Sequence, residues 1–299
     1  MPVSDPMAKK AKNETSFSED HYTPPGILIA IGGNEDKEND IEVIRAVVDV
    51  LESKKLTIEV ITTASDIPEK TGKGYMEAFD IIGVKDTNMM HIKNREDAER
   101  VEYVDRIKKA NIVYFTGGDQ LKITSILGGS MVLETIIKKY RNEKCVIAGT
   151  SAGASALSEV MVYEGESQEA LTKGTVQVTA GIGLVTNVVI DSHFIKRGRF
   201  SRLMEVVTCN PGHIGLGLGE DSGVIIRKGH VLEAIGNGLI VIFDGQHIKY
   251  SNVSKIDMGD AIAVENVIVH TLVKGNGFDL QSRRYLKPDY IMDDDQWTS

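Results

Sequence analysis

The chain has 299 residues, of which 41% are hydrophobic, so it can bury a substantial core as one large α/β domain or two smaller ones. Its formal net charge of -9 argues against a general nucleic-acid binder and against a protein held at a membrane surface by basic residues. The two cysteines, Cys145 and Cys209, cannot build a disulfide framework, which fits a reducing cytoplasm.

The two ends of the chain are polar. Residues 1–25 lack the apolar core of a secretory signal, so we expect a flexible tail there. Residues 291–299 include an acidic run and are expected to fray as a second tail. No linker rich in Pro, Gly or Ser divides residues 26–290, which predicts a single domain. No apolar run approaches the roughly 20 residues that span a bilayer, so we expect a soluble protein.

The first half of the chain alternates strands and helices. The apolar run from Gly26 to Gly33 ends in paired glycines and is typical of a buried parallel strand. The elements expected after it are a helix at about 40–53, a strand at 56–63, a helix at 97–110 and a strand at 112–118. This alternation predicts a mostly parallel central sheet flanked by helices.

The segment 144–155 predicts a strand, a tight turn and a helix, with Ser151 at the apex of the turn. Gly149 and Gly153 remove side chains that would otherwise clash across this turn. Such a setting is typical of a nucleophile elbow. The free N–H of Ala152, at the start of the helix, would face a developing oxyanion.

Three predicted strands end in glycine-containing turns, at residues 32–33, 117–118 and 149–151. In open α/β sheets the carboxyl ends of the strands carry the functional site. None of these turns has the Gly-x-Gly-x-x-Gly pattern or the Gly-Lys-Ser/Thr of a P-loop, which disfavours nucleotide binding. We expect the turn at 117–120 to direct a backbone N–H at the oxyanion and a side chain at the substrate.

A serine nucleophile needs a base, and the base needs an acid that orients it. His193 follows an apolar strand at 188–190, which would place it beside Ser151, whereas the other six histidines lack such a position. Asp191 and Glu220 are both candidates for the orienting acid. Asp191 would share a strand face with His193, and Glu220 ends another glycine-rich strand. The residues themselves leave this choice open.

Residues 195–203 contain a dense basic cluster in an acidic chain. One interpretation is the solvated start of a helix. The other is an anion site, because cations at a helix amino end oppose the macrodipole unless they have a partner. Arg199 and Arg202 are spaced to share one helical face and to bind carboxylates in a bidentate manner, which implies an anionic group on the substrate.

From about residue 223 onward, short β segments are separated by turns. They predict antiparallel ribbons that close one edge of the sheet. The predicted fold class is therefore a single α/β domain with a mostly parallel central sheet, flanking helices and added antiparallel ribbons in its C-terminal part.

Four motifs occur together in an order typical of one peptidase family. They are Gly117-Gly118-Asp119-Gln120, Gly149-Thr150-Ser151-Ala152-Gly153-Ala154, Asp191-Ser192-His193-Phe194 with the arginines that follow it, and Gly219-Glu220-Asp221. On these motifs the chain, from about Gly26 to Leu272, resembles the serine peptidase family that contains cyanophycinase and the aspartyl dipeptidase peptidase E. The resemblance implies a fold similar to that of class I glutamine amidotransferases.

The resemblance also implies roles for individual residues. Ser151 would be the nucleophile, His193 the base and Glu220 the third member, which ranks Glu220 above Asp191. N–H groups near Gly118 and Ala152 would hold the oxyanion. Substrate-pocket positions are implied for six residues: Gln120, Asp191, Ser192, Arg197, Arg199 and Arg202. Ser192 departs from the cyanobacterial cyanophycinases, which have Gln there, so its shorter side chain loses or replaces a substrate contact.

The activity that the resemblance implies is hydrolysis of cyanophycin. This polymer has a poly-aspartate backbone whose side-chain carboxyls are amide-linked to arginine, and its breakdown by such an exopeptidase releases β-aspartyl-arginine dipeptides. The reaction would proceed through an acyl-enzyme on Ser151. Two other interpretations stay open: an aspartyl dipeptidase of the peptidase E type, and a non-catalytic binding protein on the same fold.

We expect no metal and no organic cofactor. A metal site built from Asp191, His193 and Glu220 is conceivable, but no ligand-rich motif supports it. The expected partner is the cyanophycin polymer rather than a nucleic acid or a membrane. A homodimer is possible, and the expected location is the cytoplasm.

Overall fold

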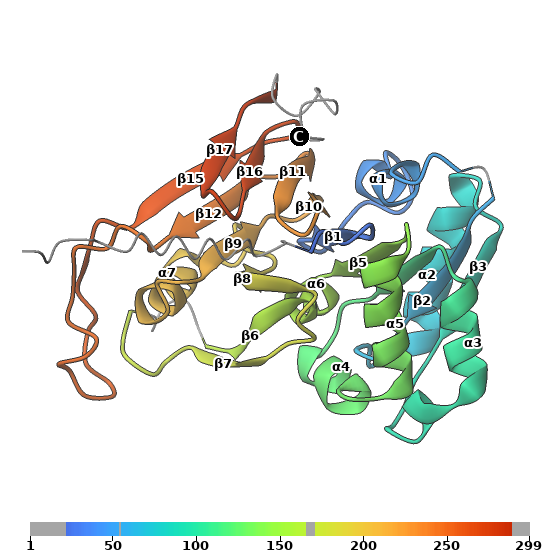
Figure 1. Cartoon of the computed structure of the whole chain (residues 1–299), viewed down its shortest axis with the longest axis horizontal. Coiled ribbons are helices and arrows are strands. Elements are labelled where there is room, and N and C mark those ends of the chain that lie inside the picture. Colours follow the sequence, from blue (N-terminus) through green and yellow to red (C-terminus); the bar gives the residue numbers. More distant parts are fainter. Residues whose placement is uncertain (1–21, 54, 166–170, 289–299) are drawn as a thin grey trace, which may run out of the picture.

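The computed structural model describes residues 22–53, 55–165 and 171–288. Within them, nine strands form the larger sheet (Figure 1). Their order is β17 (Arg284–Leu286), β16 (Gly277–Asp279), β11 (Val231–Gly236), β10 (Ser222–Arg227), β1 (Ile27–Ile31), β5 (Val146–Thr150), β4 (Ile112–Phe115), β2 (Thr57–Ile61) and β3 (Asp86–Met90). The neighbouring strands β1, β5, β4, β2 and β3 are parallel to one another. Those from β17 to β10 pair antiparallel, and β10 also runs antiparallel to β1.

A second sheet packs beside the first. Its six strands within the described residues lie in the order β15 (Ile268–Leu272), β12 (Ile240–Asp244), β9 (Ile214–Leu218), β8 (Val185–Asp191), β6 (Ser158–Glu164) and β7 (Gln177–Ala180). The strand β8 runs parallel to both β6 and β9, and the other pairs are antiparallel. A short ribbon of β13 (Tyr250–Ser251) and β14 (Val264–Glu265) lies apart from both sheets.

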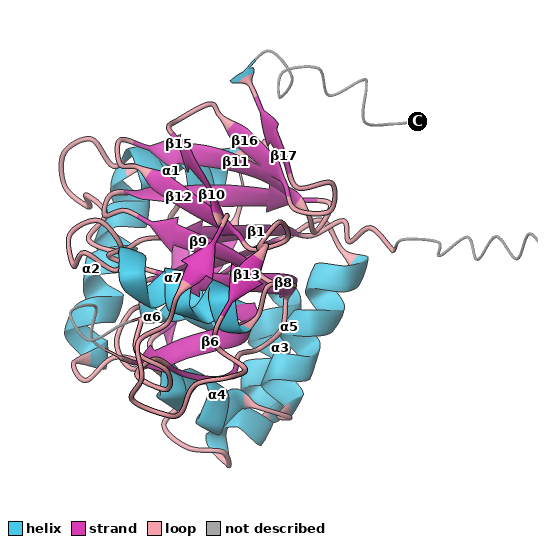
Figure 2. Ribbon diagram, turned by 90° about the vertical axis from the view of Figure 1, so that its left-hand side faces the viewer, coloured by secondary structure: helices cyan, strands magenta, loops and turns pink. Residues whose placement is uncertain are grey.

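Helices cover both sheets. They are α1 (Glu42–Asp49), α2 (Pro68–Ile81), the 3₁₀ turn η1 (Asp97–Glu99), α3 (Val101–Lys109), α4 (Gln120–Leu127), α5 (Met131–Asn142), α6 (Ala152–Leu157) and α7 (Phe200–Cys209). Figure 2 shows α3 and α5 side by side on one flank and α7 across the smaller sheet. The short helix α6 contacts β5 of the larger sheet and β8 of the smaller one, so it lies where the two sheets meet.

The side chains of β1 belong to two different parts of the hydrophobic core. Successive strand residues point to opposite faces of a sheet. Ile29 and Ile31 therefore pack in a cluster with α1 and α2, whereas Leu28 and Ala30 pack in a cluster with α3, α5 and the smaller sheet. A third cluster places α7 against the outer face of the smaller sheet. Each of these residues of β1 is fully buried, so β1 is a rigid support for the turn that follows it.

The predicted fold class is confirmed: one α/β domain has a parallel core, flanking helices and antiparallel strands in its C-terminal part. The second sheet was not foreseen. As a result, the strands that lead to Ser151 and to His193 belong to different sheets. The expected tail at 291–299, and residues 1–21 of the expected tail at 1–25, lie outside the described residues. Of the described helices, none has the length and apolar character to cross a membrane.

Candidate active site

Ser151 occupies a strained turn between β5 and α6. Its backbone has φ 53° and ψ -115°, a conformation that residues with a side chain rarely adopt. The turn closes because its neighbours are small. A Cβ at Gly149 would lie 2.5 Å from the carbonyl carbon of Gly153, and a Cβ at Gly153 would lie 2.4 Å from the carbonyl oxygen of Phe115. The strand, tight turn and helix expected at 144–155 are all present.

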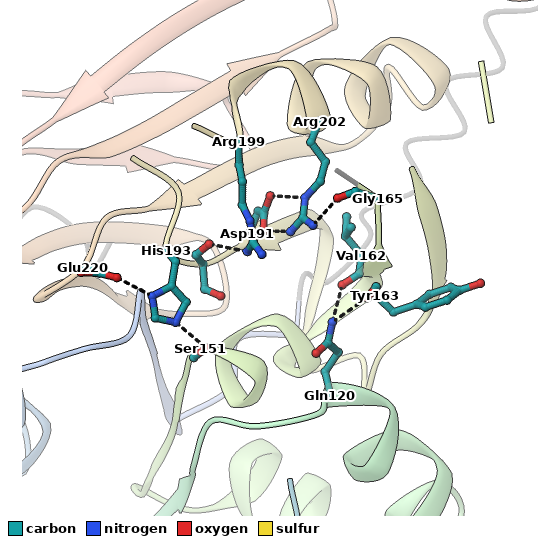
Figure 3. Close-up of polar contacts among 11 residues, drawn as sticks. Gln120, Ser151, Val162, Tyr163, Gly165, Asp191, His193, Arg199, Arg202 and Glu220 are labelled. Atoms are coloured by element: carbon teal, nitrogen blue, oxygen red, sulfur yellow. Dashed lines mark hydrogen bonds and ion pairs between the residues drawn. The ribbon is translucent and has the colours of Figure 1, made fainter. Parts of the chain in front are cut away.

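Ser151, His193 and Glu220 form a continuous series of hydrogen bonds (Figure 3). Ser151 Oγ lies 2.9 Å from His193 Nε2, and His193 Nδ1 lies 2.9 Å from Glu220 Oε1. An ionised carboxylate only accepts hydrogen bonds. Nδ1 therefore donates to Glu220, which leaves Nε2 of the neutral ring as an acceptor for the Ser151 hydroxyl.

Glu220 is kept ionised by its neighbours. The hydrogen bond from His193 is the largest influence that lowers the pKa of the Glu220 carboxyl, and the Asn34 amide adds to it. Asn34 Nδ2 donates to Glu220 Oε2 over 3.2 Å. Both carboxylate oxygens thus have a donor, which fixes the plane of the carboxylate against the imidazole.

The turn after β1 supports the loops that carry these three residues. Three successive carbonyls of this turn each accept a hydrogen bond from a backbone N–H group of one loop. The N–H of Ser151 donates to the Ile31 carbonyl over 3.0 Å, that of His193 to the Gly32 carbonyl over 2.8 Å, and that of Asp221 to the Gly33 carbonyl over 3.0 Å. Because the three carbonyls belong to consecutive residues, the distances between the three loops are set by the distances between neighbouring residues of one chain segment.

The glycines of this turn permit the close approach. A Cβ at Gly33 would lie 2.5 Å from Cε1 of the His193 ring, and a Cβ at Gly32 would lie 1.8 Å from the carbonyl oxygen of Gly219. Gly33 also has φ 98°, which lies in the region that favours glycine. The paired glycines at the end of β1 therefore make room for the imidazole ring and for the backbone of Gly219.

Asp191 is not placed to orient His193. Residue Asp191 is 1% exposed, and its carboxylate accepts hydrogen bonds from Arg199 and Arg202. The expectation that Asp191 and His193 share a strand face fails because β8 ends at Asp191 and His193 has φ 49°. Within the described ranges, no group of three His, Cys, Asp or Glu residues is arranged to hold a metal ion.

Arg202 holds Asp191 with two nitrogens of its guanidinium. Nε donates to Oδ2 over 2.9 Å, Nη2 donates to Oδ1, and Nη1 donates to the Gly165 carbonyl over 3.0 Å. Residue Arg202 is 7% exposed. The bidentate grip expected for a substrate carboxylate is thus made to a carboxylate of the protein itself, which corrects the expected orientation of this side chain.

Arg199 is the N-cap residue of α7 and contacts the same carboxylate. Its Nη1 donates to Asp191 Oδ1 over 2.9 Å and to the Ser192 carbonyl over 2.7 Å. Burial lowers the pKa of the Arg199 guanidinium, although Asp191 opposes this effect. Ser192 is itself buried, whereas Arg197 is exposed. The basic cluster is therefore neither a wholly solvated helix start nor a set of free cations.

Gly118 and Gln120 both follow β4, and Gln120 is the first residue of α4. Gln120 Nε2 donates to the Val162 and Tyr163 carbonyls of β6 over 3.1 and 3.4 Å. Gly118 has φ 141°, and a Cβ there would lie 2.0 Å from the Ala64 carbonyl oxygen. Gly117 is the residue that packs against Ser151, since a Cβ at Gly117 would lie 3.2 Å from Ser151 Cβ.

Ala152 begins α6 and is 4% exposed. The first N–H groups of a helix have no acceptor within the helix. An oxyanion role for the N–H groups of Gly118 and Ala152 stays a prediction.

A cavity of about 400 Å³ opens beside Ser151 and His193. Its walls come from the loop after β1 and from the first turns of α2, and they include Lys37 and Lys70. The sequence interpretation assigned no function to either of these segments. The only local signal was the position of Asn34-Glu35-Asp36 directly after a buried strand.

Glu35 is a buried residue in the wall of this cavity. Tyr75 Oη, Tyr114 Oη at 2.9 Å and Thr150 Oγ1 at 2.9 Å donate hydrogen bonds to its carboxylate. Burial raises the pKa of the Glu35 carboxyl, but Lys37 and the hydroxyl donors lower it by more, so the net shift is downward. Burial and the charge of Glu35 raise the pKa of both tyrosines well above its ordinary value. The cluster is therefore one carboxylate with neutral hydroxyl donors.

Comparison with known proteins places this arrangement in a family. Residues 27–234 match the model of peptidase family S51. A cyanophycinase of Synechococcus elongatus is 29% identical over 264 residues, which cover 88% of this chain and 82% of that protein. A cyanophycinase of Nostoc sp. is 30% identical over 259 residues, which cover 87% of each.

A solved structure shares the fold. The crystal structure of a peptidase from an acI-B1 actinobacterium superposes with a TM-score of 0.62 at 19% identity, covering 86% of this chain and 98% of that one. The family model spans most of the chain and ends beyond the Ser151, His193 and Glu220 loops. On this match the chain belongs to peptidase family S51 and is a serine peptidase.

Proposed function

We propose that this serine peptidase hydrolyses the poly-aspartate backbone of cyanophycin and releases β-aspartyl-arginine dipeptides. The observation that carries the chemistry is the hydrogen-bonded series from Ser151 through His193 to Glu220, with both heavy-atom distances at 2.9 Å. The substrate is supported by the cyanophycinases that match 86 to 88% of the chain.

In the proposed mechanism Ser151 Oγ attacks a backbone carbonyl carbon of an aspartyl residue while its proton passes to His193 Nε2. The negative charge on the carbonyl oxygen is stabilised by the N–H groups of Gly118 and Ala152. Glu220 stabilises the imidazolium, which then returns the proton to the leaving amine. Water hydrolyses the ester on Ser151 by the same steps, and the serine is regenerated.

The residues that we propose to face the substrate are Gln120, Asp191, Ser192, Arg197, Arg199 and Arg202. Because Arg202 and Arg199 are bound to Asp191, we propose that these three act as one charged unit. It carries two positive charges and one negative charge, so it suits a carboxylate of the arginyl arm. Arg197 is exposed and would contact the arm from outside. Ser192 would contribute through its backbone, whose carbonyl already binds Arg199.

Incubation of the purified protein with cyanophycin tests this function, with the products identified by mass. We expect the dipeptide to appear from the start, without oligomers of intermediate length, since an exopeptidase removes one unit at a time. Products from aspartyl dipeptides, but none from cyanophycin, would instead support a dipeptidase of the peptidase E type.

The matched control is Ser151→Ala, which removes one hydroxyl from a turn built of small residues. Loss of the nucleophile typically costs about a millionfold in kcat. A variant that keeps more than about a thousandth of the activity would contradict Ser151 as the nucleophile.

We also propose a cytoplasmic location. Both cysteines are free in the structure, and Cys145 is buried where burial raises the pKa of its thiol to about 11. Free thiols are typical of a reducing compartment. Fractionation of host cells with an antibody against the chain would test this location.

A further inference from the structure

The cavity beside Ser151 contains charged residues that the hydrolytic steps do not use. Ser151 and His193 lie in its wall, so a group bound there touches the reacting atoms. Its charged lining residues besides His193 are Glu35, Lys37 and Lys70, and none of the three arginines discussed above lines it. The cavity therefore has its own positive charges, separate from the unit formed by Asp191 and its arginines.

Lys37 is held in one place. Its Nζ donates to the Glu35 carbonyl over 3.2 Å, lies 3.7 Å from Glu35 Oε1 and lies 4.7 Å from the centre of the Tyr75 ring. A cation over an aromatic face is attracted by the ring quadrupole. The side chain is 31% exposed. These contacts fix a cation that still reaches the cavity, so little entropy is lost when it binds a ligand.

Glu35 offsets part of the charge of Lys37, because its carboxylate lies 3.7 Å from Lys37 Nζ. Its side chain is only 1% exposed, and its two oxygens accept hydrogen bonds from three hydroxyl groups. A ligand in the cavity therefore finds almost no exposed carboxylate surface at this point. Lys70 is exposed on α2 and makes no ion pair with another residue of the described segments. The two lysines are thus the charged groups of the cavity with exposed surface, and their two positive charges exceed the one negative charge of Glu35.

We propose that this cavity is a carboxylate subsite, in which Lys37 and Lys70 bind an anionic group of the substrate next to the bond that Ser151 attacks. The inference rests on the proposed function for the identity of that group. In cyanophycin each arginine is linked through its α-amine, so it keeps a free carboxylate. Two neighbouring units of the polymer thus supply two carboxylates, one for the lysines and one for the arginines.

A pair of small reagents tests the subsite without any peptide. The Ser151 oxygen forms a bond to the sulfur of an aryl sulfonyl fluoride, fluoride leaves, and the proton passes to His193. The rate of labelling by 4-(fluorosulfonyl)benzoate, which is anionic, is divided by the rate for neutral benzenesulfonyl fluoride, both followed by intact mass. The neutral reagent reports whether Ser151 is still active in each variant.

We expect Lys37→Gln to lower this ratio roughly tenfold, because a hydrogen bond between charged groups is lost. Lys70→Gln should lower it by less, since the side chain is exposed, and the double variant should lower it most. The control is Lys73→Gln, on the same helix, whose side chain is 78% exposed and pairs with Glu77. Its ratio should equal that of the wild type. A wild-type ratio in the double variant would overturn the subsite.

A second measurement uses cyanophycin and separates the two proposals. The subsite predicts that Lys37→Gln raises KM roughly tenfold and leaves kcat within a factor of about three. If the wild type does not hydrolyse cyanophycin, the proposed function fails while the reagent ratio still decides the subsite. If the wild type hydrolyses cyanophycin and the double variant keeps the wild-type reagent ratio and KM, the subsite alone fails.

Discussion

Two buried carboxylates lie close to the Ser151–His193 pair, and they are neutralised in different ways. Asp191 accepts from two guanidinium groups, and Arg202 reaches it with two nitrogens. Glu35 accepts from three neutral hydroxyl groups and has one ammonium 3.7 Å away. The directional donors around Asp191 are thus occupied within the protein, whereas Lys37 beside Glu35 keeps part of its surface in a cavity.

The two carboxylates also hold different parts of the site in place. The unit of Asp191, Arg199 and Arg202 links the end of β8 to the start of α7, so it holds the loop that carries His193. The Glu35 cluster binds Thr150, which precedes the nucleophile, and holds Lys37 at the cavity. A substitution in the first unit should therefore cost the most stability, and its effect on the reaction should come through KM for the substrate. A substitution in the second should cost less stability and should also lower kcat/KM.

The largest expected effect distinguishes Asp191 from the acid that binds His193. Glu220→Gln should lower kcat about ten-thousandfold, because an amide stabilises the wrong tautomer of the imidazole and lacks the charge that supports the imidazolium. Asp191→Asn should lower kcat far less in the fraction that stays folded. The measurement is kcat at saturating cyanophycin, corrected by the fraction of each variant that is folded. The reverse order would assign the third member to Asp191.

Asp191→Asn should instead destabilise the fold. The change leaves the buried Arg202 without its charge partner, and breaking a buried pair costs about 3 to 5 kcal/mol. Urea unfolding of the wild type and the variant measures this loss. The control is Asp105→Asn, which removes the exposed partner of Lys108 and should change the free energy of unfolding by less than about 0.5 kcal/mol. Equal losses for both variants would show that the arginines find other partners.

Glu35→Gln should cost less than Asp191→Asn, since its donors are neutral. One oxygen becomes an amide group that cannot accept, so at least one buried hydroxyl loses its partner at a cost of about 1 to 3 kcal/mol. Because Thr150 and Lys37 both contact Glu35, kcat/KM should also fall. Thr150→Val tests the link to the nucleophile alone. A Glu35→Gln variant with wild-type kinetics would reduce the cluster to a purely structural one.

The sequence predicted well what depends on local pattern. The elbow at Ser151 was foreseen because Gly149 and Gly153 must be small whatever surrounds them, and the alternation of strands and helices was equally local. The second sheet was not foreseen, because β5 and β8 are both short apolar runs and nothing in either sequence states its partner strand.

Side-chain partners were the least predictable. The spacing of Arg199 and Arg202 suggested a grip on carboxylates, but only the turn between β8 and α7 decides that the carboxylate is Asp191. The positive φ of His193 had the same kind of effect, since it removed His193 from the strand face of Asp191. Glu35 followed a buried strand in the sequence, yet a carboxylate at such a position has the same appearance whether it is buried or faces a substrate.

The two arginines themselves should differ. Arg202 contacts Asp191 through two nitrogens, whereas Arg199 uses Nη1 alone. A lysine can replace a one-point contact but not a planar two-point contact. We therefore expect Arg202→Lys to lower the free energy of unfolding by about 1 kcal/mol more than Arg199→Lys does. Urea unfolding of both variants measures the difference. An equal or opposite order would mean that Arg199 contributes more than its contacts indicate.

The smallest expected effect is the pH dependence that Glu220 contributes. The hydrogen bond from His193 is the largest cause that lowers the pKa of Glu220 below its ordinary 4.5. A carboxyl with a lowered pKa in the folded state adds stability that is fully present above its ordinary value and is lost as the pH falls through its folded pKa. The side chain is 27% exposed, so this contribution should stay below about 1 kcal/mol.

The measurement is urea unfolding of the wild type and Glu220→Gln from about pH 7 to about pH 3. The difference between their free energies of unfolding should be constant at first and vanish at the acid end. Glu134→Gln, on the exposed surface of α5, gives the background. A difference that grows as the pH falls would mean that the fold stabilises the neutral form of the Glu220 carboxyl. The proposed role of Glu220 in catalysis would then lose the negative charge on which it depends.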